Sequence, residues 1–381
     1  MAPTGIDDEP RVNRALLVSA SVYACLIAAG APFIGQARTA VRAAFPRAFA
    51  TIAGGVVAVL LGAMVMAALV RIRDRRLLRY GALGAALLLG AAFSRMLRTG
   101  NIEVDVVETF HFVEYGCLTL LFYLACRPFD DGSVFVLPVM ASLLVAILDE
   151  WFQWFVPLRV GELRDVLLDG AAVGCGLLFS LGVQPPTRFS LALRPGSLRR
   201  VTVAVGLASL AFGGFFQTVH LGHEVADLGS DTFRSRYSRE ELEAADRDRS
   251  KRWREQPPLV QRPFSREDQY LSEALWHAQR RNRAWGSGDL FVAWRENVIL
   301  ETFFAPVLDN PTYASQTGLR WPPEQRADAA RRTARMVGPY ESDAEPYPIY
   351  TWRASFFWMG LIAVAGAGLL GLAVAHDEPP L

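Results

Sequence analysis

The chain has 381 residues, is 52% hydrophobic and has a mean hydropathy of +0.21, which is too apolar for an ordinary soluble enzyme of this length. Its 39 basic and 38 acidic residues give a formal net charge of +1, so no excess of positive charge is available to bind nucleic acid. The charged residues are segregated from long apolar windows. These features argue against nucleic acid as a partner and predict a membrane protein with an extramembrane part.

The apolar windows predict an all-α, polytopic membrane protein. A helix needs about 20 apolar residues to cross a hydrocarbon core of ~30 Å. About eight windows approach that length. They cover residues 15–35, 48–70, 80–97, 106–126, 134–156, 166–183, 201–219 and 354–375. The first window follows two arginines, as a signal peptide would, but its length favours a retained anchor.

Arginine clusters predict the orientation, because short cytoplasmic loops are enriched in Lys and Arg. The densest cluster lies in residues 71–79, between the second and third windows, and another lies in residues 188–200. A topology with both termini in the cytoplasm places both clusters in the cytoplasm. Three arginines count against it, because they would lie in the first loop outside the cytoplasm: Arg38, Arg42 and Arg47. This topology places the polar segment 220–353 outside the cytoplasm.

Ionisable residues interrupt three of the apolar windows. On a helix, positions three and four apart share a face, so Glu108, His111, Glu114 and Tyr115 are predicted to form one polar stripe in the fourth span. Similar residues end the fifth span, open the sixth and occupy the turn between them. They are Asp149, Glu150, Gln153, Arg159, Arg164, Asp165 and Asp169.

Short connections make sequential helices neighbours, so the three stripes are expected to converge on one outward-opening pocket. A charged side chain in the middle of a spanning helix costs about 2.5–3.5 kcal/mol on insertion scales. Three interpretations remain open. The residues can form an ionic network that joins three helices, a site for the polar head of an envelope lipid, or a divalent metal site built from Asp149, Glu150, Asp165 and Asp169.

The same residues resemble the pattern of VanZ-like membrane proteins. That pattern joins a His-x-x-Glu-Tyr helix to an Asp-Glu-x-x-Gln helix, followed by a Pro-Gly-Arg turn and an Asp-Val-x-x-Asp helix. The resemblance covers roughly residues 108–182. Two positions depart from it: Leu158 replaces the turn glycine, and Phe152 stands where a His is frequent. The reach of the arginine is therefore expected to differ, and a role for that second His is absent.

The resemblance implies a multi-pass protein of the bacterial cytoplasmic (inner) membrane. VanZ-like proteins are linked to reduced susceptibility to glycopeptide antibiotics, especially teicoplanin, and the resemblance implies the same link here. We expect the protein to bind or modify a lipid or a lipid-linked envelope precursor at the outer leaflet. The candidate catalytic residues are His111, Glu114, Asp149 and Glu150. The candidate substrate-binding residues are Glu108, Tyr115, Gln153, Arg159, Arg164, Asp165 and Asp169.

No P-loop, dinucleotide fingerprint or nucleophile elbow occurs in the sequence, which gives little support to a hydrolase, a nucleotide-driven pump or a dehydrogenase. The sequence leaves open whether the protein is an enzyme and identifies no cofactor. The chain is predicted to consist of three parts. Residues 1–219 form a membrane bundle with its VanZ-like core at about 106–183, residues 220–353 form a mainly helical extracytoplasmic domain, and residues 354–381 form a final span and a short tail. The alternative function is a membrane scaffold whose outer domain recruits protein partners from the envelope.

Helix-start signals at Ser238-x-x-Glu241 and Ser265-x-x-Asp268 support helices over about 239–255 and 266–284 in this domain. Two further helices are expected at about 289–308 and 323–336.

A second metal hypothesis concerns the exit of the seventh span, which carries a His-x-x-His-Glu pattern and a nearby aspartate. A transition from helix to membrane interface explains those residues equally well. They are His220, His223, Glu224 and Asp227.

Overall fold

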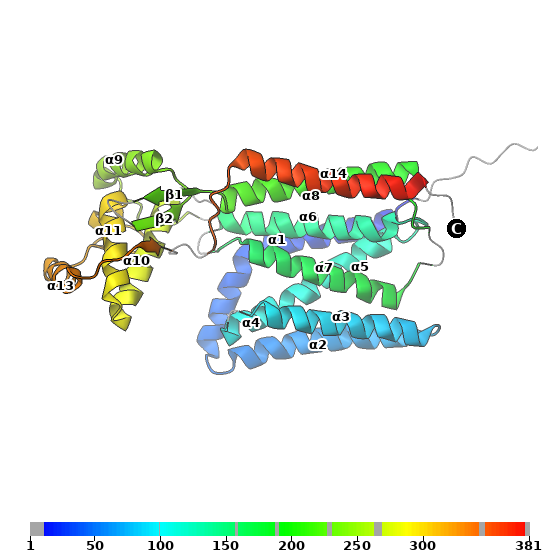
Figure 1. The fold of residues 1–381 in the computed structure, drawn as a ribbon. Helices are drawn as coiled ribbons and strands as arrows, with labels where there is room; N and C mark the ends of the chain where they lie inside the picture. The colour runs from blue at the N-terminus through cyan, green and yellow to red at the C-terminus, as the bar shows by residue number, and fades with distance from the viewer. Residues whose placement is uncertain are drawn as a thin grey trace, which may run out of the picture. The chain divides into compact units, whose positions relative to one another are not determined.

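The computed structural model describes residues 11–98, 100–156, 159–186, 190–226, 231–262, 269–342 and 347–377 (Figure 1). The chain forms two compact units. The first contains Met1–Gln153, Gly161–Phe215 and Trp358–Leu381, and the second contains Trp154–Val160 and Phe216–Phe357. Some residues used in the sequence interpretation lie outside the described ranges. They are Leu158, Arg188, Asp227, Ser265 and Asp268.

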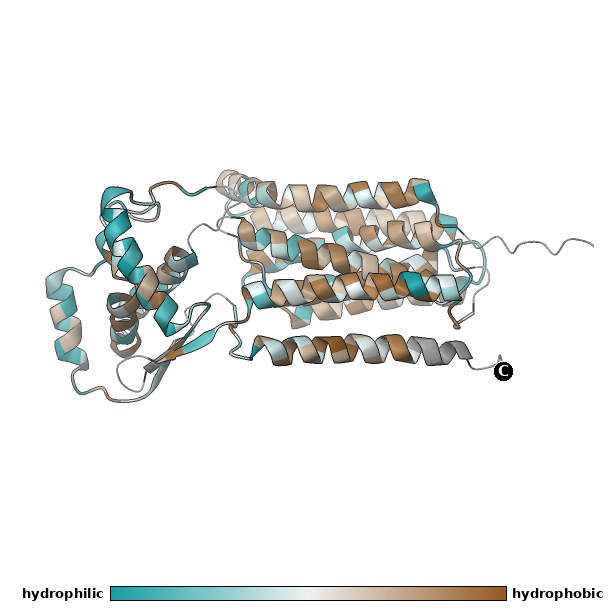
Figure 2. Ribbon diagram, turned by 90° about the horizontal axis from the view of Figure 1, so that it is seen from above, coloured by the Kyte–Doolittle hydropathy of each residue, from teal (hydrophilic) through white to brown (hydrophobic). Residues whose placement is uncertain are grey.

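Eight helical spans long and apolar enough to cross a membrane are found within the described residues, which confirms the polytopic all-α fold. Figure 2 shows apolar residues along these helices. The spans are α1 (Arg14–Ala44), α2 (Phe49–Arg71), α3 (Arg76–Met96), α4 with α5 (Ile102–Glu108 and Phe110–Cys126), α6 (Ser133–Phe155), α7 (Leu163–Val183), α8 (Pro195–Val219) and α14 (Ala354–Asp377).

The fourth span is broken at Thr109, between α4 and α5. The Thr109 hydroxyl donates a hydrogen bond to the backbone carbonyl of Val106 at 2.5 Å, an interaction by which Thr competes with regular helical geometry. The break separates Glu108, at the end of α4, from His111 and Tyr115 on α5. Glu108 therefore lies on a different helical segment from His111 and Tyr115 and has different partners, a division that the sequence did not predict.

Helix α7 packs between α3 and α5, and its contact with α5 is made by glycine. A Cβ built on Gly176 would lie 2.8 Å from the Cα of Gly116, so the two backbones are almost in contact. On either side of this crossing, Leu118, Ala172 and Val173 are buried in one apolar cluster. Small residues allow such close approach of membrane helices, where van der Waals packing drives association.

Two adjacent glycines in α8 accommodate tryptophan rings. A Cβ on Gly214 would meet the ring of Trp151 at 2.5 Å, and a Cβ on Gly213 would meet the ring of Trp358 at 2.2 Å. The Trp151 ring can therefore lie against the α8 backbone only because no side chain is present there. This contact fixes the part of α6 that carries Asp149 and Glu150.

Polar contacts at the ends of the spans show which connections share an end of the helical bundle. Arg79, at the start of α3, donates from Nε to the carbonyl of Gly182, at the end of α7, at 2.8 Å. Asp131, between α5 and α6, accepts from the backbone N–H of Arg194, just before α8, at 3.0 Å. The arginine-rich residues 71–79 and 194–200 therefore lie on one side of the bundle.

The second unit combines helices with a small sheet that the sequence did not predict. Strand β1 (His223–Ala226) pairs antiparallel with β2 (Asp231–Ser235), and β2 pairs parallel with β3 (Tyr340–Ser342). The third strand is only three residues long and comes from a distant part of the chain. A strand this short shows no alternation that a local pattern could reveal.

The helices of the second unit follow the prediction closely except at one break. The predicted helix at 289–308 is two helices, because Pro306 has no N–H to continue the ladder. Helix α9 begins with the predicted capping box at Ser238 and Glu241. The helices are α9 (Arg239–Glu255), α10 (Gln269–Ser287), α11 (Leu290–Phe303), α12 (Ala305–Asp309) and α13 (Pro323–Thr333).

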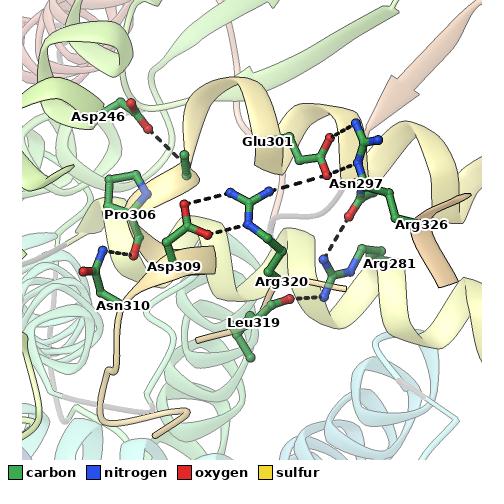
Figure 3. Close-up of polar contacts among 11 residues, drawn as sticks. Asp246, Arg281, Asn297, Glu301, Pro306, Asp309, Asn310, Leu319, Arg320 and Arg326 are labelled. Atoms are coloured by element: carbon green, nitrogen blue, oxygen red, sulfur yellow. Dashed lines mark hydrogen bonds and ion pairs between the residues drawn. The ribbon is translucent and has the colours of Figure 1, made fainter. Parts of the chain in front are cut away.

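The second unit has its own core and its own polar network. Trp253, Tyr270 and Phe303 are almost fully buried in one apolar cluster. Figure 3 shows how polar residues join the adjacent helices and loops: Arg281 donates to Asn297 Oδ1 at 3.0 Å and to the Leu319 carbonyl at 2.7 Å. Burial lowers the pKa of Arg281 to about 10. A continuous core of this kind is characteristic of a domain that folds as a unit.

The glycine contact between α5 and α7 generates a test with a matched control. Gly176→Val should lower the melting temperature of the detergent-purified protein, because the added atoms must displace the α5 backbone. Overpacking of this kind costs about 1–3 kcal/mol. Gly174→Val on the same helix meets no atom within 4 Å and should have a much smaller effect. Equal losses in the two variants would contradict the proposed importance of the close approach.

Candidate functional site

The centre of the candidate site is a hydrogen bond between His111 on α5 and Asp169 on α7. His111 Nδ1 lies 2.6 Å from Asp169 Oδ1. The Asp169 side chain is fully buried, whereas that of His111 is 19% exposed. A carboxylate that holds one imidazole nitrogen fixes the orientation of the ring. The other nitrogen is then directed for hydrogen bonding or proton transfer.

Tyr115, Asp149 and Gln153 extend this centre onto α6. The Tyr115 hydroxyl donates to Asp149 Oδ2 at 3.3 Å, and Gln153 Nε2 donates to the same oxygen at 2.8 Å. The rings of His111 and Tyr115 lie parallel, 6.1 Å apart between centroids. Helices α5, α6 and α7 therefore all contribute to one connected polar cluster, as the sequence predicted.

Glu108, Arg164 and Asp165 form a separate ion network near the ends of α4 and α7. The Arg164 guanidinium binds Glu108 through two parallel hydrogen bonds, at 2.9 and 2.6 Å, and contacts Asp165 at 3.2 Å. It also donates to the backbone carbonyl of Leu97, just after α3. Bidentate Arg–carboxylate pairs are geometrically specific. The guanidinium predicted to bind substrate is thus held by a carboxylate of the protein.

Glu150 and Glu162 lie where α6 and α7 approach each other. Glu150 is buried, with 1% of its surface exposed, and one of its carboxylate oxygens accepts from the backbone N–H of Glu162 at 3.3 Å. Burial, followed by repulsion from Asp165, raises the pKa of the Glu162 carboxyl to about 7, against the opposing effect of Arg164. Glu162 immediately precedes α7 and was not among the predicted site residues.

Negative charge exceeds positive charge in this region. Glu114 is close enough to His111, Asp149 and Asp169 to interact with them electrostatically. Asp149 Oδ1 and Asp169 Oδ2 are buried and have no hydrogen-bond partner among the described residues. A buried carboxylate oxygen without a donor is unfavourable, so these atoms can accept hydrogen bonds from a ligand or carry a proton.

The structure brings most of the predicted site residues together, but not all. Arg159 belongs to the second compact unit, whereas the cluster belongs to the first. His220 is packed by aromatic rings and hydrogen-bonded through Nδ1 to the Pro348 carbonyl at 2.9 Å. Within the described ranges, no three His, Cys, Asp or Glu side chains are grouped to hold a metal ion.

The second unit contains a buried polar centre that sequence reasoning missed. Glu296 on α11 is fully buried, bonds His277 Nδ1 at 2.7 Å and accepts from Tyr340 and Ser342 of β3. Burial alone would raise the pKa of Glu296, but the interactions with His277, Ser342 and Tyr340 outweigh it and lower that pKa. The sequence signal for this centre was a row of ionisable residues spaced by four on one face of α10, all of which are buried. They are Glu273, His277 and Arg281.

The fold and the cluster define a polytopic helical membrane protein with an ionisable centre built from three successive spans. Residues 89–183, which contain this centre, match the family model VanZ/LLP1. This match confirms the resemblance to the VanZ-like family and extends it towards the N-terminus, into α3. No curated protein and no solved structure matches the chain significantly.

The raised pKa of Glu162 predicts a specific pH dependence of stability. Between its ordinary value of 4.5 and about 7, the folded state binds more protons at Glu162 than the unfolded state does. Stability should therefore fall as the pH rises through this window. Glu162→Gln should reduce the loss of melting temperature between pH 4.5 and 8, and Glu255→Gln at the exposed end of α9 should not. An unchanged pH profile in Glu162→Gln would refute this assignment.

Proposed function

We propose that the VanZ-like domain binds the polar head group of a lipid or a lipid-linked envelope component and exchanges a proton with it through His111. The observation that carries this proposal is the 2.6 Å contact between His111 and the buried Asp169. It orients an imidazole within the membrane spans and leaves that side chain partly exposed. A positioned His beside a carboxylate is a frequent arrangement for general acid–base chemistry.

The charge of the cluster determines which part of a head group it suits. Asp149, Glu150 and Asp169 are buried carboxyl groups, whereas Arg164 is held by Glu108 in a bidentate pair. Carboxylates accept hydrogen bonds and repel a phosphate that lacks a counter-charge. We therefore assign to the cluster the hydroxyl or amino groups of the head group. The unpartnered oxygens of Asp149 and Asp169 are the corresponding acceptors.

The proposed orientation follows from the side on which the arginines gather. The ends of the spans near residues 71–79 and 194–200 share one side of the bundle, and cytoplasmic loops are enriched in such residues. We propose that this side faces the cytoplasm of a bacterial inner membrane. The cluster, Glu108 and Arg164 then face the outer leaflet, as does the second unit. The same proposal includes a link to glycopeptide susceptibility, which is supported only by the similarity to the VanZ-like family.

Replacing the His111 imidazole or the Asp169 carboxylate with an uncharged amide should abolish proton exchange with the head group and preserve the fold. We expect His111→Gln and Asp169→Asn to eliminate any head-group conversion, detected by mass spectrometry of envelope lipids incubated with the purified protein. A positioned acid or base contributes about 10²–10⁴-fold in rate. Asp149→Asn and Glu150→Gln should alter which head groups co-purify.

The control is a substitution of an acidic residue outside the site. Asp246, which accepts hydrogen bonds from Tyr270 and the Ala305 backbone, can be changed to Asn without touching the VanZ-like domain. All variants should be compared at equal monodispersity and with melting temperatures measured in parallel. If the site variants keep the lipid profile and the conversion of the wild type, the polar residues serve only to join α5, α6 and α7.

A scaffold function is the second proposal, and the independent core of the second unit supports it. That unit carries exposed apolar side chains, including Leu259, Val260 and Val337. Leu259 and Val260 are adjacent in the chain, and contiguous exposed apolar side chains are characteristic of interaction surfaces. We expect Val260→Glu with Val337→Glu to remove envelope partners that co-purify with the full-length protein, while the lipid profile stays unchanged. Retention of every partner would count against recruitment through these residues.

A further inference from the structure

A cavity of about 470 Å³ lies within the first unit, between α2, α3, α5 and α7. Its wall is predominantly apolar and includes Ala58 and Leu61 of α2, Ala91 of α3, Phe112 of α5 and Phe179 of α7. The volume falls in the range of roughly 300–1,000 Å³ that small-molecule sites occupy. Nothing in the sequence distinguishes these residues, because apolar residues are expected throughout spanning helices.

The cavity is elongated along the helices. On α2 its lining runs from Gly54 to Val65, and on α3 from Ala86 to Ser94, with Arg98 just beyond the end of that helix. At a rise of 1.5 Å per residue, these segments are about 16 Å long on α2 and about 12 Å long on α3. The wall is made of side chains of regular helices and offers few polar partners, so a peptide backbone could not satisfy its hydrogen bonds there. The shape and chemistry suit an extended hydrocarbon chain.

One end of the cavity is polar and carries a positive charge. Ser94, Arg98 and Thr109 line this end. Arg98 is exposed and makes no ion pair with any other described residue. The neighbouring carbonyl of Leu97 is bound by Arg164, so the mouth of the cavity adjoins the Arg164–Glu108 pair. An arginine at the open end of an apolar cavity is complementary to an anionic head group.

We propose that this cavity holds one acyl chain of an anionic phospholipid, with the lipid phosphate against Arg98. This inference rests on the proposed function in that the same lipid presents the rest of its head group to the carboxylate cluster. Helix α5 separates the two parts of the site, because Phe112 lines the cavity whereas His111 binds Asp169. The phosphate and the hydrogen-bond donors of one lipid thus have different sites, which avoids repulsion between phosphate and carboxylates.

The test measures retention of phosphatidylglycerol by native mass spectrometry of the full-length protein, with phosphatidylcholine as competitor. Ala91→Phe fills the cavity, and Arg98→Gln removes the cation at its mouth. Each should weaken retention of phosphatidylglycerol about tenfold, the change expected when one charge-assisted hydrogen bond or an equivalent amount of apolar contact is lost. The matched controls are Ala63→Phe on α2 and Arg95→Gln on α3, which do not line the cavity.

The inference is overturned if Ala91→Phe and Arg98→Gln retain phosphatidylglycerol as the wild type does, or if all four variants lose it equally. Preference for a polyprenyl phosphate over phosphatidylglycerol would also overturn the assignment to a phospholipid. His111→Gln, measured in parallel, separates this inference from the proposed function. Normal retention with lost conversion supports both, whereas normal retention and normal conversion in His111→Gln refutes only the proton-transfer role.

Discussion

The close approach of α5 and α7 is the contact on which the geometry of the site depends. A Cβ at Gly176 would lie 2.8 Å from the Cα of Gly116, the residue that follows Tyr115. Asp169 lies two turns before Gly176 on α7, on the same side of that helix. The backbone contact therefore brings His111 within hydrogen-bond distance of Asp169. Larger residues at this crossing would separate the helices and leave a carboxylate buried without its partner, which is unfavourable in the membrane.

The distribution of charge divides the region into parts with different chemistry. Arg164 and Glu108 satisfy each other and connect the ends of α3, α4 and α7. Asp149 and Asp169 each retain a buried oxygen without a partner among the described residues. A structural network gains most when all of its members are satisfied, because partly satisfied buried groups destabilise the fold. The unpartnered oxygens therefore favour a ligand site over a network that only joins the helices.

Sequence patterns predicted the spans and most of the cluster because long apolar windows and i, i+4 spacing are strong local signals. His111, Asp149 and Asp169 were found because ionisable residues are rare within membrane helices. The break at Thr109 was missed, since a single Thr is compatible with a continuous helix. Strand β3 and the cavity were also missed. Both depend on segments far apart in the chain, and the apolar lining does not differ in composition from ordinary spans.

Helix α6 shows how the candidate site is linked to the rest of the chain. Gln153 bonds Asp149 within the first unit, and the next residue, Trp154, already belongs to the second. There the Trp154 ring donates to the Tyr347 hydroxyl at 3.3 Å and lies 5.8 Å from the Arg236 guanidinium. No flexible loop separates Trp154 from Gln153, because α6 continues to Phe155. One continuous helix therefore carries Asp149 and Gln153 of the candidate site and Trp154 of the second unit.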